Sequence, residues 1–318
     1  MRFLTTIIIF FFMTGCLLAQ EVSNVRVQQR TDGNFFVDIW YNLGYSGDNM
    51  ITVFIEASSD NGATWALECS NLTGDIGGYI MPGTDKHVVW DFYADNPNVS
   101  GNQYKVRVTA SDEYMMGNDG KIYKTVKIGN QVWMAENLRE TLYRNGDPIP
   151  EELNGYDWPF FTSGARCSYD NSESVAEIYG YLYNWYAAVD ARHIAPEGWH
   201  VPSDTDWNIL RSYLGPNSIH SGAGGKMKET GTVHWGSPND GATNESGFTA
   251  LPAGYRFGED TPYTGFFSAL QNSTYYWNST SSTIENVEML SQYHAMLEHE
   301  YYQKTCGLSI RLIKDNEE

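Results

Sequence analysis

Basic residues are scarce in this chain of 318 residues. There are 20 Lys and Arg against 39 Asp and Glu, which gives a formal net charge of -19. A strongly acidic surface repels phosphate groups, so we expect no nucleic-acid partner. Proline is also scarce, with 11 residues against 30 glycines, and this balance favours a turn-rich β protein over a helical bundle.

The motifs of several enzyme and metal-binding classes are missing as well. The sequence contains no HExxH, GxSxG, P-loop or Rossmann motif, and no CxxC pair from which a zinc site could be built. The seven histidines follow no metal-binding spacing. We therefore expect no catalytic residue, and no cofactor other than a calcium ion held in a loop.

The chain starts with an apolar run that is too short for a membrane span. Arg2 precedes this run over residues 4–18, whereas a spanning helix needs about 20 apolar residues, so residues 1–20 are predicted to form a signal peptide. Cleavage could follow Ala19 or Gln20, or Cys16 could become the lipidated first residue of a lipoprotein. In both cases we expect an exported protein, at the outer membrane surface or outside the cell. Contact with the membrane would then occur only through a lipid on Cys16.

Three cysteines follow the predicted signal peptide: Cys69, Cys167 and Cys306. An odd number in an oxidising compartment leaves at least one thiol unpaired. A disulfide between Cys167 and Cys306, which both lie in the second half, is the simplest pairing. Three free, buried thiols are the alternative, since cysteine is commonly buried, and the sequence leaves both open.

The length predicts two domains, because a single core rarely extends beyond about 250–300 residues. Residues 21–112 carry short runs of alternating apolar residues separated by turn-forming Gly, Asn and Asp, a pattern typical of strands. Their number and spacing predict an all-β sandwich, immunoglobulin-like or fibronectin-like. The polar, Gly-containing stretch 113–120 is predicted to be a linker, and 121–315 a second domain.

Local signals in the second domain predict two strands and two helices. Gly129-Asn130 is a hairpin turn between strands over 122–128 and 131–134. Apolar spacing predicts one helix from an N-cap at Ser174 to about Val189, and a second helix that begins at Ser203 and ends before Gly215-Pro216.

Five stretches of this half carry a family resemblance. They are DGKIYKTVKIGNQVWMAENL (119–138), YGYLYNWYAA (179–188), PEGWHVPSDTDW (196–207), ATNESGFTALPAGYR (242–256) and GLSIR (307–311). They are similar to the Fibrobacter succinogenes major paralogous domain, a family of exported bacterial modules. The resemblance implies an α+β, C-type-lectin-like fold, distantly similar to sulfatase-modifying factors, with its N- and C-terminal strands side by side. The family has no established activity, so the resemblance implies a fold and leaves the function open.

Residues 285–304 give two conflicting predictions. They contain no Pro or Gly and are rich in Glu, Met and Leu, so propensity predicts a helix. The resemblance implies a strand, and we expect the strand.

The candidate site residues lie in the loops and strands of the second domain. Trp277-Asn278 stands where lectin-like folds turn a strand toward ligand, so we expect a ligand-binding face formed by Trp235, Asn244, Glu245, Tyr276, Trp277 and Asn278. If Trp277 packs in the core, then Tyr276 and Asn278, on the other side of the strand, would contact ligand. An oxygen-rich loop offers weak calcium ligands at Asn239, Asp240, Asn244 and Glu245. It holds only two carboxylates, so an ordinary hydrogen-bonded turn is the preferred interpretation.

Aromatic residues make up 14% of the chain, and such rings either cover a loop-rich core or form binding platforms. The function that we expect is a non-catalytic, exported binding module whose ligand is a polysaccharide or another surface protein. One alternative is an enzyme related to sulfatase-modifying factors, with Cys306 and Cys167 as its reactive cysteines. The other is a purely structural envelope protein.

Overall fold

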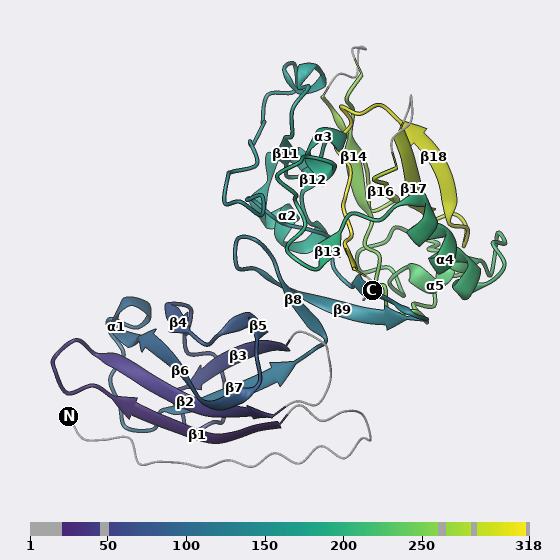
Figure 1. The fold of residues 1–318 in the computed structure, drawn as a ribbon. Helices are drawn as coiled ribbons and strands as arrows, with labels where there is room; N and C mark the ends of the chain where they lie inside the picture. The colour runs from purple at the N-terminus through teal and green to yellow at the C-terminus, as the bar shows by residue number, and fades with distance from the viewer. Residues whose placement is uncertain (1–20, 45–50, 260–264, 281–284, 316–318) are drawn as a thin grey trace. The chain divides into compact units, whose positions relative to one another are not determined.

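The computed structural model describes residues 21–44, 51–259, 265–280 and 285–315. The chain divides into two compact units, Met1–Met116 and Gly117–Glu318, which are described one at a time (Figure 1). Residues 1–20, with Cys16, lie outside the described residues, so the export signal and the lipid anchor stay predictions. Among the described helices, none has the length and apolar character needed to cross a membrane.

The first unit contains two antiparallel sheets with a shared apolar core. The strand orders are β1-β2-β6-β4 and β5-β3-β7. The elements are β1 (Glu21–Gln29), β2 (Phe36–Gly44), β3 (Ile51–Ser58), β4 (Leu72–Gly74), β5 (Gly77–Ile80), β6 (Gly83–Asp91), the helix α1 (Phe92–Asp95) and β7 (Lys105–Ser111). Ile39 of the first sheet and Ile55 of the second belong to the same buried cluster. The alternating apolar runs of 21–112 therefore do form strands that bury one face.

The segment 113–120 was predicted to be a linker, and the division of the chain falls inside it, but its first half also forms a strand. Tyr114–Met116 form strand β8, and the chain divides directly after Met116. The Thr52 hydroxyl donates to the carbonyl of Tyr114 at 3.1 Å, and the Phe54 and Tyr114 rings pack edge to face. Three residues are too few to show the alternating pattern from which strands are predicted.

The predicted hairpin is the first strand pair that follows in the second unit. β9 (Ile122–Ile128) and β10 (Gln131–Met134) pair around Gly129, whose φ of 64° suits a residue without a Cβ. β10 also pairs with the last strand, β19 (Ile313–Lys314), which in turn pairs with β13 (Trp199–His200). The expected pairing of the N- and C-terminal strands of this domain is therefore correct.

The two predicted helices have different outcomes. Residues 174–189 do not form one helix but are divided among α2 (Glu173–Tyr179), β12 (Leu182–Tyr183) and α3 (Trp185–Ala188). Gly180 ends α2 with a φ of 81°, and a Cβ there would lie 2.6 Å from the Cβ of Asn137, so the chain turns away instead of continuing the helix. The second helix, α4 (Asp204–Leu214), begins after Ser203 and ends at Gly215 as predicted.

Another sheet of the second unit has the order β15-β14-β16-β17-β18. Its strands are β14 (Ala253–Arg256), β15 (Phe267–Leu270), β16 (Ser273–Trp277), β17 (Glu285–Ser291) and β18 (Glu298–Tyr302). The strand interpretation of 285–304 is confirmed, because cross-strand pairing of β17 with β16 and β18 overrides the local helix propensity. The remaining short elements are η1 (Trp158–Phe160), β11 (Arg166–Cys167), η2 (Tyr169–Asn171) and α5 (Ala223–Met227).

Long loops complete the second unit, and buried cations hold them together. Lys228 is fully buried, and its ammonium donates to the carbonyls of Asp240, Ser291 and His294 at 2.9, 2.8 and 3.0 Å. Loop carbonyls have no helix or strand partner of their own, so a buried cation with several N–H donors satisfies them. Arg256, with carbonyls of other loops, makes the same kind of contact.

Candidate functional site

The aromatic residues predicted to form a ligand-binding face are buried. Trp235, Tyr276, Trp277 and Asn278 are each at most 1% exposed. β16 is the central strand of its sheet and is covered on both sides. The Tyr276 ring packs on that of Trp207 with centroids 5.9 Å apart, while the Trp277 indole N–H donates to the carbonyl of Tyr183 at 2.6 Å. Trp277 therefore packs in the core, which was one of the two alternatives. The prediction that Tyr276 and Asn278 would then contact ligand is wrong, because neither side of β16 faces solvent.

The four predicted calcium ligands have other partners. The Asn239 amide donates to the carbonyls of Glu229 and Gly231, and the Asp240 carboxylate contacts the His220 imidazole. The Asn244 amide donates to the Thr249 hydroxyl, and the Glu245 carboxylate pairs with the Lys226 ammonium. The Lys228 ammonium also donates to the carbonyl of Asp240, which places a cation of the chain itself in this loop. Over the described ranges, no three His, Cys, Asp or Glu side chains gather as a metal site. These hydrogen bonds support the interpretation of the loop as a hydrogen-bonded turn, and the absence of a calcium ion stays a prediction.

Cys167 and Cys306 are free, buried thiols, so the bridge between them is not formed. Cys69 is also free but only partly buried, so the alternative of three free, buried thiols holds for two of the three. Cys167 lies on β11 and Cys306 follows β18, and each is at most 2% exposed. Burial raises the pKa of both thiols to about 11. A nucleophilic cysteine needs the opposite shift, toward the thiolate. The geometry therefore gives no support to a reactive cysteine pair.

We expect neither thiol to react with iodoacetamide in the folded protein near neutral pH, because both are buried and protonated. Both should become alkylated after denaturation without any reductant, since no bridge protects them. Mass spectrometry of tryptic peptides measures both states. Labelling of native Cys306, or a requirement for reductant before Cys167 reacts, would contradict this.

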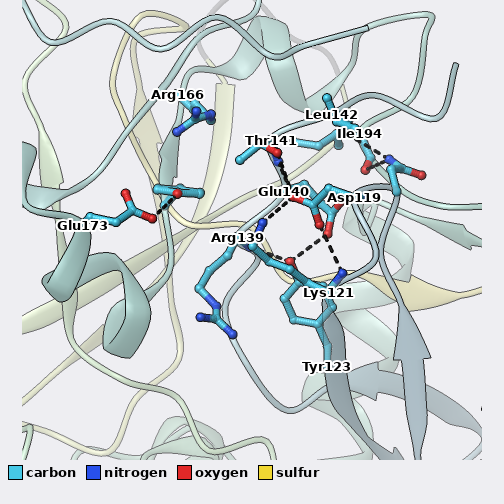
Figure 2. A network of polar contacts seen from close by, with 12 residues as sticks. Asp119, Lys121, Tyr123, Arg139, Glu140, Thr141, Leu142, Arg166, Glu173 and Ile194 are labelled. Atoms are coloured by element: carbon cyan, nitrogen blue, oxygen red, sulfur yellow. Dashed lines mark hydrogen bonds and ion pairs between the residues drawn. The ribbon is translucent and has the colours of Figure 1, made fainter. Parts of the chain in front are cut away.

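A buried polar network joins the start of the second unit to the loop after β10 (Figure 2). The Tyr123 hydroxyl donates to Glu140 Oε1 at 2.7 Å, and the Asp119 N–H donates to Glu140 Oε2 at 3.1 Å. The Asp119 carboxylate accepts from the Lys121 ammonium and from the Thr141 hydroxyl. Burial, together with the Asp119 charge, raises the pKa of Glu140 to about 7.

A carboxyl with a raised pKa is often found at a functional site. Here Glu140 and Tyr123 are both fully buried, so no substrate reaches them. Gly117 packs directly on the carboxyl, since a Cβ there would lie 1.8 Å from Glu140 Oε1. We therefore interpret the network as a contribution to the stability of the second unit and not as a ligand-binding site.

Three of the exposed aromatic residues of the second unit lie elsewhere, on two loops that touch. Tyr156 and Phe160 are 82% and 64% exposed around η1, and Phe266 is 61% exposed in the turn before β15. The loops meet at two glycines: a Cβ on Gly265 would lie 2.1 Å from the carbonyl oxygen of Gly155. We call Tyr156, Phe160 and Phe266 the aromatic face.

Arg256 holds the two loops of the aromatic face in place. Its guanidinium is fully buried and donates to the carbonyls of Glu152, Leu153 and Gly265 at 2.6, 3.3 and 3.1 Å. It also stacks on Trp158, 4.4 Å from the ring centroid, under η1. One cation therefore fixes the base of both loops, so that the exposed rings stand on a supported surface.

Oxygen-bearing side chains flank the rings. Asn154 and Asp157 are exposed beside Tyr156 and Phe160, and the Asn154 amide donates to the Asp157 carboxylate at 2.6 Å. Glu152 accepts the N–H of Asn154 at 2.6 Å. The residues 151–161 carry three carboxylates and no basic side chain. The face thus combines aromatic rings with hydrogen-bond acceptors and negative charge.

Sequence reasoning missed this face because it followed aromatic residues near β16. A usable signal is present in 153–160, where apolar residues stand in a stretch that is otherwise polar and contains the turn former Gly155. Trp158 alone of this stretch is buried against Arg256. Only the tertiary contact with Gly265 brings Phe266 to the same place.

The comparisons with known proteins give one family. The family model of the Fibrobacter succinogenes major domain matches residues 126–314, which is more than half of the chain. Searches of the curated proteins and of the solved structures find no match.

Proposed function

The chain belongs to the Fibrobacter succinogenes major domain family, and from this premise we propose that it is an exported, non-catalytic binding module. Membership of the family assigns no activity, so the proposal depends on the surface of the second unit. The observation that carries it is the aromatic face: Tyr156, Phe160 and Phe266 are all more than 60% exposed on loops that are clamped from below. Gathered exposed rings on a supported surface are typical of an interaction site.

In this proposal the second unit has a C-type-lectin-like fold and the first unit is an immunoglobulin-like or fibronectin-like sandwich that presents it. The pairing of β10 with β19 and the helices beside long loops support the first assignment, and the two antiparallel sheets support the second. The module acts at the outer membrane surface or outside the cell. Its ligand is a polysaccharide or another surface protein.

The enzyme alternative needs a reactive thiol, and the raised pKa of Cys167 and Cys306 argues against one. The purely structural alternative predicts no ligand at all. Binding measurements on variants of the aromatic face discriminate between it and our proposal.

We expect the triple variant Y156A/F160A/F266A to lose binding to an isolated bacterial envelope fraction, while its melting temperature stays close to that of the wild type. All three rings are exposed, so their removal takes away little buried surface but most of the contact area. Co-sedimentation measures binding, and differential scanning calorimetry measures stability.

Tyr301→Ala is the matched control. Tyr301 lies on β18 of the same unit and is 61% exposed, as Phe266 is, but it is not part of the aromatic face. This variant should bind like the wild type. If the triple variant binds as well as Tyr301→Ala, the aromatic face is not the ligand site and the proposal is wrong.

A further inference from the structure

We infer that the aromatic face binds an uncharged, hydroxyl-rich polysaccharide lying across Tyr156, Phe160 and Phe266. This inference depends on the proposed function and names the ligand class of the same site. It follows from three properties of the face: its rings, the acceptors beside them and its charge.

The rings set the shape of the ligand. A sugar ring has a face of C–H groups that stacks on an aromatic ring and a rim of hydroxyl groups that stays hydrated. Tyr156 and Phe160 come from one loop and Phe266 from another, and all three are exposed on the surface and not sunk into it. Such an arrangement suits successive sugar rings of a chain that lies along the surface.

The polar groups set its chemistry. Asn154 and Asp157 are exposed next to the rings and offer amide and carboxylate oxygens to hydroxyl donors. Hydrogen bonds from a hydroxyl to a carboxylate are stronger than those between neutral groups. A ligand with many hydroxyl groups therefore complements this edge of the face.

The negative charge of the loop that carries Tyr156 and Phe160 argues against anionic polysaccharides as ligands. Glu151, Glu152 and Asp157 lie in the same loop as Tyr156 and Phe160. Glu151 pairs with the Arg166 guanidinium at 3.2 Å, whereas Glu152 and Asp157 accept hydrogen bonds from the uncharged Asn154, and the whole chain carries a net charge of -19. A uronate, sulfate or phosphate group on the polysaccharide would meet like charges at close range. The ligand is therefore expected to be neutral.

The arrangement is also held before any ligand arrives. Arg256 fixes Glu152, Leu153 and Gly265 through their carbonyls, and the backbones of Gly155 and Gly265 are in contact. A supported site loses little conformational freedom on binding, which favours affinity for a flexible polymer.

Affinity electrophoresis of the full chain in native gels tests this, with hydroxyethylcellulose and galactomannan as neutral probes and carboxymethylcellulose and polygalacturonate as anionic ones. We expect at least one neutral polymer to retard the wild type, and Phe266→Ala to weaken that binding about tenfold, the loss of roughly one aromatic contact. Asp157→Asn should weaken it several-fold without a change in melting temperature. Carboxymethylcellulose should bind less well than hydroxyethylcellulose, which has the same backbone.

Retardation by the anionic polymers alone, or neutral binding that persists in Y156A/F160A/F266A, would overturn the inference. If no polymer retards the wild type while the triple variant still loses envelope binding, the ligand class is wrong and the proposed function stands. If the triple variant matches the wild type in both assays, both are wrong. Tyr301→Ala is the control throughout.

Discussion

Replacing Arg311 by Met is expected to lower the free energy of unfolding of the second unit by about 3–5 kcal/mol, because it removes a buried charge on which several carbonyls depend. Arg311 is fully buried. Its guanidinium donates to the Asn137 side-chain oxygen at 2.7 Å and to the carbonyls of Met134, Phe248 and Thr249 at 3.0, 2.7 and 3.0 Å. A methionine has a similar length but leaves these acceptors without a donor, at about 1–3 kcal/mol for each buried group.

Hydrogen–deuterium exchange of peptides from the second unit measures this loss directly and separates it from the first unit. Arg311→Lys is the matched variant: it keeps the charge but not the planar fork of donors, so it should lie between the wild type and Arg311→Met. The Phe248 ring, 4.5 Å from the guanidinium, can still stack on either cation. A loss of less than about 1 kcal/mol in Arg311→Met would show that water replaces the guanidinium at these carbonyls.

Arg311 also shows where sequence reasoning stops. The stretch 307–311 was part of the family resemblance, yet nothing in the sequence indicates that its arginine is buried, since charged residues are mostly exposed. The reason lies in loops distant in the sequence, whose carbonyls at 134, 248 and 249 converge on it. Lys228 and Arg256 were missed for the same reason.

The elements that were predicted correctly depend on residues that are close together in the chain. The Gly129-Asn130 hairpin and the helix after Ser203 each depend on a few neighbouring side chains, and both are present. The break of the predicted helix at Gly180 was missed because it depends on the close approach of Asn137. The same limit applies to the candidate site: β16 was predicted to have a free side, but its central place in the sheet buries both.

The pH dependence of Glu140 gives the second large effect. Its pKa is raised to about 7 in the folded protein, from an ordinary value of 4.5, by burial and by the charge of Asp119. Between these two values the folded chain holds a proton that the unfolded chain has released. The stabilisation from this proton is therefore fully present below pH 4.5 and is lost as the pH rises through about 7. A shift of this size corresponds to about 3 kcal/mol.

Glu140→Gln removes the titration and nearly keeps the shape. The amide oxygen can still accept from Tyr123 or from the Asp119 N–H, which are the donors of the network in Figure 2. We expect the free energy of unfolding of this variant, measured relative to the wild type by urea denaturation, to shift in the variant's favour by about 3 kcal/mol as the pH is raised from about 4.5 to above 7. Other titrating groups are present in both proteins, so their contributions cancel in the difference.

The sign of this shift distinguishes a buried acid from a charged partner. Were Glu140 ionised in the folded protein and held by a cation, Glu140→Gln would be less favourable at high pH, because the paired carboxylate would stabilise the fold there. Lys121, the candidate cation, instead pairs with Asp119. Burying Glu140 in its protonated form therefore costs less free energy than burying two ionised carboxylates side by side. Glu177→Gln, on the exposed side of α2, is the matched control. A difference between Glu140→Gln and the wild type that stays constant with pH would show that Glu140 titrates alike in the folded and unfolded chains, and that Glu140 and Asp119 are both ionised at neutral pH.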